Sequence, residues 1–208
     1  MIKSVAFASC YVYSPGGTGS VCERSRLLRA LLKTGDARFL VKYANRVQQQ
    51  AADSTHLAGF FLADDVLVPV PGSSPRSCGL WVAASLADAL VREGLGALSW
   101  PGLRRICAVR KSATAAPGAR PSVDAHYASF LMERPPRELR SVILVDDVIT
   151  KGRTLLAAAA RVREALPGAQ IRAFALLRTM GLTPSIRQLL NPCRGEITWT
   201  GGDARRMP

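Results

Sequence analysis

Short apolar runs alternate along the chain with segments whose apolar residues recur every three or four positions. Runs of β-branched and aromatic residues predict strands, and the longer spacing predicts helices with one buried face. Because the two alternate, they predict an α/β fold with a mostly parallel sheet that helices cover on both faces. The predicted strands are 4–13, 66–71, 103–109, 141–145 and 171–177, and the predicted helices are 20–34, 36–50, 77–93, 122–133 and 154–165.

Start and stop signals mark the ends of some of these elements. Ser20 and Glu23 have the spacing of a capping box at a helix start, and Gly35 is a natural helix end. Residues 179–208 are weakly patterned, which predicts a small cap or a partly disordered end. We therefore expect a single domain over 1–208, with an N-terminal strand and helices over 1–65, a core over 66–178 and a C-terminal hood or tail over 179–208.

Composition narrows the class of protein. The 208 residues are 48% hydrophobic and 21% charged, which is typical of a folded domain and excludes disorder over most of the length. No apolar run reaches the roughly 18 residues of a membrane span, so we expect no membrane partner. The 28 Lys and Arg residues exceed the 15 Asp and Glu residues, and the net charge of +13 leaves a nucleic-acid partner open.

The five cysteines indicate a reducing compartment. They are odd in number, widely spaced and form no C-x-x-C motif, so neither a zinc ribbon nor a disulfide framework is predicted. We interpret them as reduced thiols, and we expect a cytoplasmic protein.

The most informative motif joins two adjacent carboxylates to a glycine loop. The predicted strand that ends at Val145 delivers Asp146 and Asp147, and a tight loop with Gly152 and two threonines leads into a helix. Ligands of open α/β sheets bind at this edge, and backbone N–H groups at a helix start hold anions. The carboxylates can accept hydrogen bonds from vicinal hydroxyls while the loop holds a phosphate, so the motif suits a sugar phosphate.

This stretch, VILVDDVITKGRT over 142–154, resembles the phosphoribosyl pyrophosphate (PRPP) signature of the type I phosphoribosyltransferases. The resemblance implies a mostly parallel core sheet with flanking helices and a small hood, and Mg²⁺ that arrives with PRPP. Lys151 and Arg153 stand where the family has small residues, and they either contact a phosphate or point into solvent. The implied site residues are Asp146 and Asp147, which hold the ribose and indirectly the metal, and the loop Val148, Ile149, Thr150, Lys151, Gly152, Arg153 and Thr154.

A second segment supports the first. Val68-Pro69-Val70-Pro71, a Ser/Gly turn, Arg76 and Gly79 resemble the pyrophosphate loop of the ComF-like branch, which is associated with DNA uptake and competence. Leu80-Trp81-Val82 replaces the polar residues that start the next helix in that branch. The resemblance implies that pyrophosphate is bound by Pro71, Gly72, Ser73 and Arg76, although Arg76 can equally be an ordinary surface arginine.

A third segment resembles the family's flexible catalytic loop. Arg110 and Lys111 precede a stretch rich in Ala, Pro and Gly, and a cation there would stabilise the departing pyrophosphate. Arg120 and His126 follow as weaker candidates, and His126 can equally be a helix histidine with its hydrogen bonds satisfied.

Two functions are compatible with these patterns. The first is a phosphoribosyltransferase, a pentosyltransferase that moves ribose 5-phosphate from Mg-PRPP to a nitrogen nucleophile such as a nucleobase and releases pyrophosphate. The second is a non-catalytic ligand-sensing or effector module of the same fold that associates with nucleic acid, in competence or phage defence. Homodimers are common in the family, so a homodimer is one option, and the resemblance leaves both the oligomeric state and the acceptor open.

Overall fold

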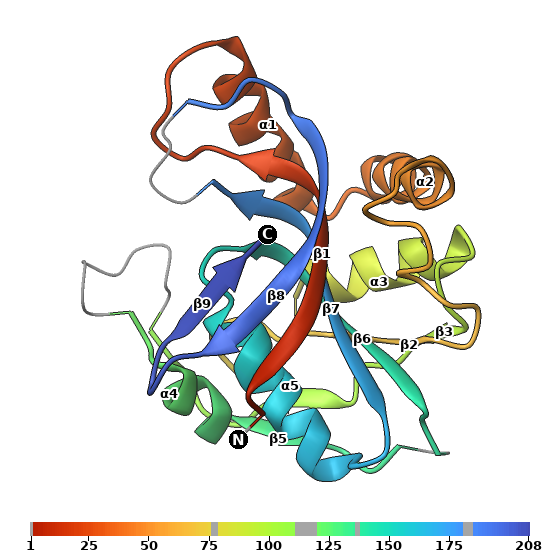
Figure 1. Cartoon of the computed structure of the whole chain (residues 1–208), viewed down its shortest axis with the longest axis vertical. Coiled ribbons are helices and arrows are strands. Elements are labelled where there is room, and N and C mark those ends of the chain that lie inside the picture. Colours follow the sequence, from red (N-terminus) through yellow and green to blue (C-terminus); the bar gives the residue numbers. More distant parts are fainter. Residues whose placement is uncertain (1, 76–78, 111–119, 136–137, 181–184) are drawn as a thin grey trace.

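A mostly parallel sheet of seven strands organises the computed structural model, which describes residues 2–75, 79–110, 120–135, 138–180 and 185–208 (Figure 1). The strands lie in the order β3-β2-β6-β7-β1-β8-β9. Neighbours from β3 to β1 pair in parallel, whereas β8 is antiparallel to β1 and to β9. The bounds are β1 Ser4–Tyr13, β2 Val66–Pro69, β3 Leu98–Ser99, β6 Ser141–Ile149, β7 Gln170–Thr179, β8 Leu190–Trp199 and β9 Ala204–Met207. The predicted α/β class is confirmed.

Helices cover both faces of this sheet and enclose a separate core on each. Along β6, Val142 and Leu144 face the core that contains α5 (Arg153–Ala165), whereas Ile143 and Val145 face the core under the first three helices. This alternation follows from the two-residue period of a strand, and it explains why β6 is apolar on both sides. The other helices are α1 Ser20–Thr34, α2 Ala37–Asp53, α3 Val82–Arg92 and α4 Val123–Ala128. In the described ranges, no helix is long and apolar enough to cross a membrane.

The start of α1 differs from the prediction, while its end agrees. Gly19 is the N-cap, and its carbonyl accepts from the Glu23 amide at 3.1 Å, so Ser20 already lies inside the helix. The predicted capping box is therefore wrong, and no side chain caps this helix. Gly35 ends α1 with a φ of 67°, as expected. The side chain of Asp36 then caps α2.

Two predicted segments are corrected by strand pairing. The predicted hood or tail contributes β8 and β9, which extend the main sheet beyond β1. Only Cys193 and Ile197 of β8 are buried, so this strand leaves little apolar pattern to recognise. The predicted helix 122–133 ends at Ala128, because Phe130–Met132 forms β5 and pairs with β4 (Leu103–Arg105) in a second, small sheet.

A buried ion pair joins the amino-terminal ends of the central strands, opposite the strand ends that bear the acidic motif. Asp65, just before β2, is fully buried and accepts from a guanidinium nitrogen of Arg172 on β7. Its carboxylate also accepts from the Ser141 hydroxyl and the Leu62 amide, each at 2.6 Å. Arg172 also donates to the Phe60 carbonyl. One carboxylate thus joins three segments of the core.

Candidate functional site

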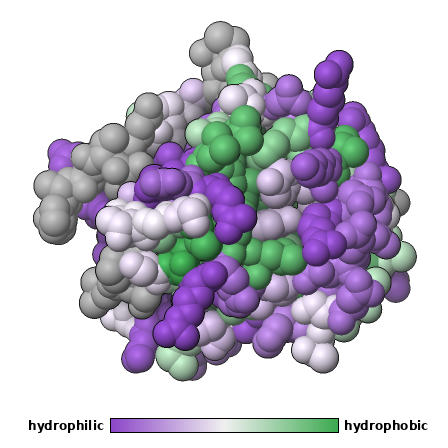
Figure 2. Space-filling model, turned by 90° about the horizontal axis from the view of Figure 1, so that it is seen from above, coloured by the Kyte–Doolittle hydropathy of each residue, from purple (hydrophilic) through white to green (hydrophobic). Residues whose placement is uncertain are grey.

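A cleft of about 890 Å³ opens where β2 and β6 end. Its walls come from the loop after β2, the end of β6, the start of α3, the β4–β5 sheet and one residue of α1. Figure 2 shows apolar side chains gathered at the centre of the face seen from above, with hydrophilic residues around them. Apolar and charged walls together are typical of a small-molecule site. The lining residues used below are Lys33, Pro71, Gly72, Ser73, Leu80, Trp81, Arg105, Asp146 and Asp147.

The pKa values of the two adjacent aspartates are shifted in opposite directions. Both lie near the end of β6, which continues through Ile149 rather than stopping before them. Burial, together with the neighbouring carboxylate of Asp147, holds the pKa of Asp146 well above its usual range. Burial would also raise the pKa of Asp147, but the ammonium of Lys33 and the hydrogen bonds from Asp146 and the Val148 amide together outweigh burial and lower that pKa. The cleft therefore presents an ionised Asp147 beside an Asp146 that keeps its proton to higher pH.

Lys33, which sequence reasoning missed, supplies the cation of this pair. It lies near the end of α1, and its ammonium contacts Oδ2 of Asp147 while about half of its side chain stays exposed. In the sequence it reads as an ordinary cation in the last turn of a helix, where it complements the helix dipole. Only the packing of α1 over the sheet brings it to Asp147.

Replacing Lys33 by methionine is expected to raise the pKa of Asp147, because the variant keeps much of the side-chain volume and removes the positive charge that stabilises the carboxylate. A titration of the aspartate carboxyl carbons followed by ¹³C NMR would show Asp147 gaining its proton at higher pH than in the wild type. Lys42→Met, on the exposed side of α2, serves as the control and should leave the titration unchanged. An identical titration in both variants would contradict the ion pair.

The loop after β2, the predicted pyrophosphate loop, forms one wall of the cleft. Pro71, Gly72 and Ser73 line it, whereas Arg76 lies outside the described residues. The Trp81 indole donates to the Val70 carbonyl at 3.0 Å and so ties the start of α3 to this loop. Trp81 is thus a wall residue of the cleft rather than a fully buried core residue.

The segment predicted as a catalytic loop begins beside the same wall. The Val109 amide donates to the Ser73 carbonyl at 2.7 Å, so the chain contacts the loop after β2 at this point. The next residue, Arg110, is exposed. Lys111 lies outside the described residues. Arg120 is exposed, and its carbonyl accepts from Arg153 at 3.4 Å.

The predicted phosphate loop begins α5 but does not line the cleft. Residues 148–154 are all described, and none of them is part of the cleft walls. Val148 and Ile149 pack against the two cores, so only their backbone can reach a ligand. Thr150 is exposed, and Gly152 caps the helix with a φ of 88°. A Cβ on Gly152 would come within 2.7 Å of Ile197, so the loop needs glycine for both conformation and space.

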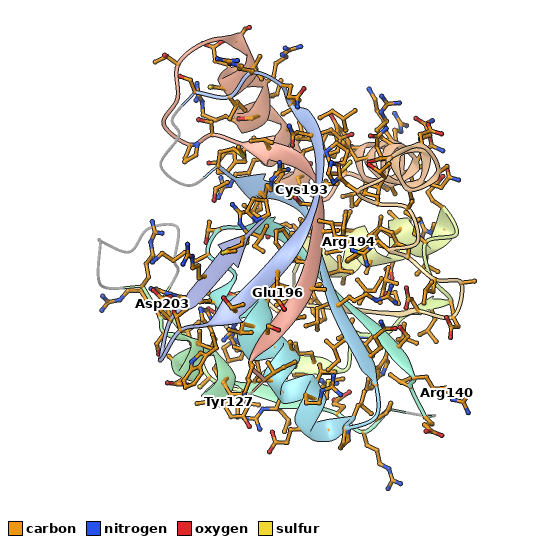
Figure 3. The ribbon with its side chains drawn as sticks, in the orientation of Figure 1. Tyr127, Arg140, Cys193, Arg194, Glu196 and Asp203 are labelled. Atoms are coloured by element: carbon orange, nitrogen blue, oxygen red, sulfur yellow. The ribbon has the colours of Figure 1, made fainter. Side chains whose placement is uncertain are left out.

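The two unexpected cations of this loop are paired with one carboxylate. Lys151 donates to Asp203 at 3.1 Å, and Arg153 donates to both carboxylate oxygens of Asp203, one of them at 2.8 Å. Asp203 lies in the turn between β8 and β9 (Figure 3). The hydrogen bond from Arg153 holds the pKa of Asp203 well below its usual range. We expected these two cations either to contact a phosphate or to point into solvent. The structure instead pairs both of them with Asp203, a contact that sequence reasoning missed.

The metal predicted to accompany PRPP has a limited donor set here. Among the described residues, no three His, Cys, Asp or Glu side chains are grouped as a metal site. Mg²⁺ is commonly held by one or two carboxylates together with substrate phosphates. Asp146 and Asp147 fit that mode, in which the metal arrives with a polyphosphate.

Comparison with known proteins adds no assignment. No protein-family model matches the chain, and no curated protein sequence is significantly similar to it. The function is therefore inferred from the motifs and the geometry of the cleft.

Proposed function

We propose that this protein is a phosphoribosyltransferase that transfers ribose 5-phosphate from Mg-PRPP to a nitrogen nucleophile and releases pyrophosphate. The observation that carries the proposal is the cleft in which Asp146 and Asp147 face the loop Pro71–Ser73. A PRPP molecule needs hydroxyl acceptors and a pyrophosphate cradle within the length of one sugar. The glycine loop that follows β6 adds a helix N-terminus for the 5′-phosphate.

The residues of the cleft suit the charge changes of that reaction. The nucleophile's nitrogen forms a bond to C1 as the bond from C1 to the pyrophosphate oxygen breaks, and the leaving group keeps the electron pair. Asp147 accepts hydrogen bonds from ribose hydroxyls, and Lys33, which also lines the cleft, supplies a cation that can offset the growing negative charge. Bound Mg²⁺ supplies further charge neutralisation at the pyrophosphate. The nucleophile loses its extra proton to solvent or to a cleft carboxylate.

Incubation of the protein with Mg-PRPP and a panel of nucleobases and amines is expected to release pyrophosphate with at least one acceptor. The measurement is a coupled pyrophosphate assay, and a wild-type reaction without acceptor gives the background of hydrolysis. Because the cleft wall includes Leu80 and Trp81, we expect planar aromatic acceptors to give faster pyrophosphate release than aliphatic amines. Silence with every acceptor would argue against transfer.

A non-catalytic ligand-sensing module is the second candidate, favoured by three observations. Lys151 and Arg153 already share the carboxylate of Asp203, and apolar residues stand at the start of α3. In addition, α2 exposes Arg38, Lys42 and Arg46, one turn apart, where they can face a polyanion. This candidate predicts no pyrophosphate release together with nucleic-acid binding that weakens steeply as salt rises.

A further inference from the structure

A buried arginine connects the two anion-binding parts of the site. Arg105 of β4 is only 4% exposed and lines the cleft. Its Nε donates to the Gly72 carbonyl in the predicted pyrophosphate loop, and its Nη1 donates to the Ser129 hydroxyl. The guanidinium also lies 4.2 Å from the centre of the Phe130 ring. These three groups fix the position of this cation.

His126 continues the connection to the phosphate loop. Its Nδ1 lies 3.5 Å from Nη2 of Arg105, and its Nε2 lies 3.5 Å from the Thr154 hydroxyl. A guanidinium can only donate, so Nδ1 must accept and the ring proton must be on Nε2. The Nε2–H group then donates to Oγ1 of Thr154, and the threonine keeps its own O–H for another acceptor.

We propose that His126 is a positioning residue for phosphate binding, because it orients Thr154 so that the threonine O–H donates to a phosphate at the start of α5. This inference rests on the proposed function, in which that phosphate is the 5′-phosphate of PRPP. Arg105 and His126 together form a link of side chains from the cleft wall at Gly72 to the loop that does not itself line the cleft. His126 is not part of the cleft walls, so it acts through Thr154.

The surroundings of His126 favour the neutral imidazole that this role requires. Burial lowers the pKa of His126, and together with the cations that face it, Arg105 from β4 and Arg153 from α5, it brings that pKa to about 4. The ring therefore stays neutral at physiological pH and keeps one donor and one acceptor.

The helix that carries His126 is also held firmly against α5. The hydroxyl of Tyr127 donates to Glu164 at 2.8 Å, and Arg161 donates to the Tyr127 carbonyl at 3.0 Å. The Arg161 guanidinium lies 3.9 Å from the centre of the Tyr127 ring. These contacts keep the short helix α4 in register with the start of α5, so the distance from His126 to Thr154 is fixed by packing.

The tautomer is tested first, in the protein without ligand. The chain has two histidines, so spectra of wild type and of His56→Gln assign the His126 ring nitrogens by ¹⁵N NMR. We expect a neutral ring with the proton on Nε2 at pH 7. A proton on Nδ1, or a charged ring, overturns the inference whether or not PRPP binds.

Two replacements then separate the two hydrogen bonds of the ring. The amide nitrogen of glutamine reaches the position of Nε2, whereas asparagine reaches only that of Nδ1. We expect His126→Gln to bind PRPP within about threefold of wild type, and His126→Asn to bind about tenfold more weakly, with kcat changed less than KM. Adding Thr154→Ala to His126→Asn should weaken PRPP binding little further, because the two residues act through one contact.

Ribose 5-phosphate, which lacks the pyrophosphate, is measured beside PRPP by calorimetry to separate this inference from the proposed function. Binding of ribose 5-phosphate with the expected difference between the two variants supports the inference even if PRPP is not turned over. Equal affinities in the Asn and Gln variants overturn it while leaving the proposed function standing. Absence of binding of both ligands to the wild type overturns both.

Discussion

Replacing Asp146 and Asp147 together by asparagine is expected to abolish the rise in Tm that Mg-PRPP produces in the wild type. A ligand present at about 100 times its Kd stabilises a protein by about 2.7 kcal/mol, which corresponds to a rise of roughly 5–10 °C for a chain of this size. A hydrogen bond to a charged group contributes about 1.5–3 kcal/mol. Losing the hydrogen bonds of the ionised Asp147 together with those of Asp146 removes roughly the whole ligand-induced stabilisation, so the shift should fall below about 1 °C.

The Tm without ligand distinguishes loss of binding from loss of folding. Asparagine keeps the shape of each side chain and removes the repulsion between two adjacent carboxylates, so the double variant should fold. The matched control is the double variant Asp53→Asn and Asp88→Asn, which changes the charge equally at two exposed sites on α2 and α3. The control should keep the full shift with Mg-PRPP. A full shift in the Asp146 and Asp147 variant would show that PRPP binds elsewhere.

Replacing Asp65 by alanine is expected to cost about 3–5 kcal/mol of the free energy of unfolding, because it leaves Arg172 charged and buried without its partner. Arg172 is 4% exposed and Asp65 is fully buried, so water cannot compensate for the loss. The hydrogen bonds from Ser141 and Leu62 would be lost with the same substitution. Chemical denaturation measures the change, which corresponds to a fall in Tm of roughly 6–20 °C.

An exposed ion pair provides the contrast for this prediction. Arg104 and Glu133 form a salt bridge with side chains that are 66% and 39% exposed, and Arg104→Ala should cost less than about 1 kcal/mol. The double variant Asp65→Leu and Arg172→Met should recover part of the loss, because it removes both buried charges. If Asp65→Ala lowered the free energy of unfolding as little as Arg104→Ala, the buried pair would not stabilise the amino-terminal ends of the central strands.

Local sequence signals predicted the elements that carry the acidic motif. Apolar residues before Asp146 predicted a buried strand, and the glycine at position 152 predicted the turn into a helix, because both depend on neighbours within a few residues. The same local reasoning failed for residues 129–133, where pairing of β5 with β4 outweighs the helical pattern. It also failed at the start of α1, where Gly19 rather than Ser20 is the N-cap.

The partners of the site could not be predicted in this way, because they come from distant parts of the chain. Lys33 reaches Asp147 only through the packing of α1, and Asp203 reaches Lys151 and Arg153 only because β8 and β9 join the main sheet. Arg105 is a further example, since an arginine in a short strand normally indicates an exposed position.

The sequence by itself thus determined the α/β class, the strands β1, β2, β6 and β7 with the helices α1, α2, α3 and α5, and the place of the two aspartates near a strand end. Those features follow from periodicity and from residue types that are adjacent in the chain. Only the tertiary structure decided which charges meet. It paired Lys33 with Asp147, and so shifted the pKa values of Asp146 and Asp147 in opposite directions. It also paired Asp203 with Lys151 and Arg153, and it buried Arg105 against Gly72 and Ser129. The physical reason is that Coulomb and hydrogen-bond energies depend on distances in space and on burial, which local pattern does not encode.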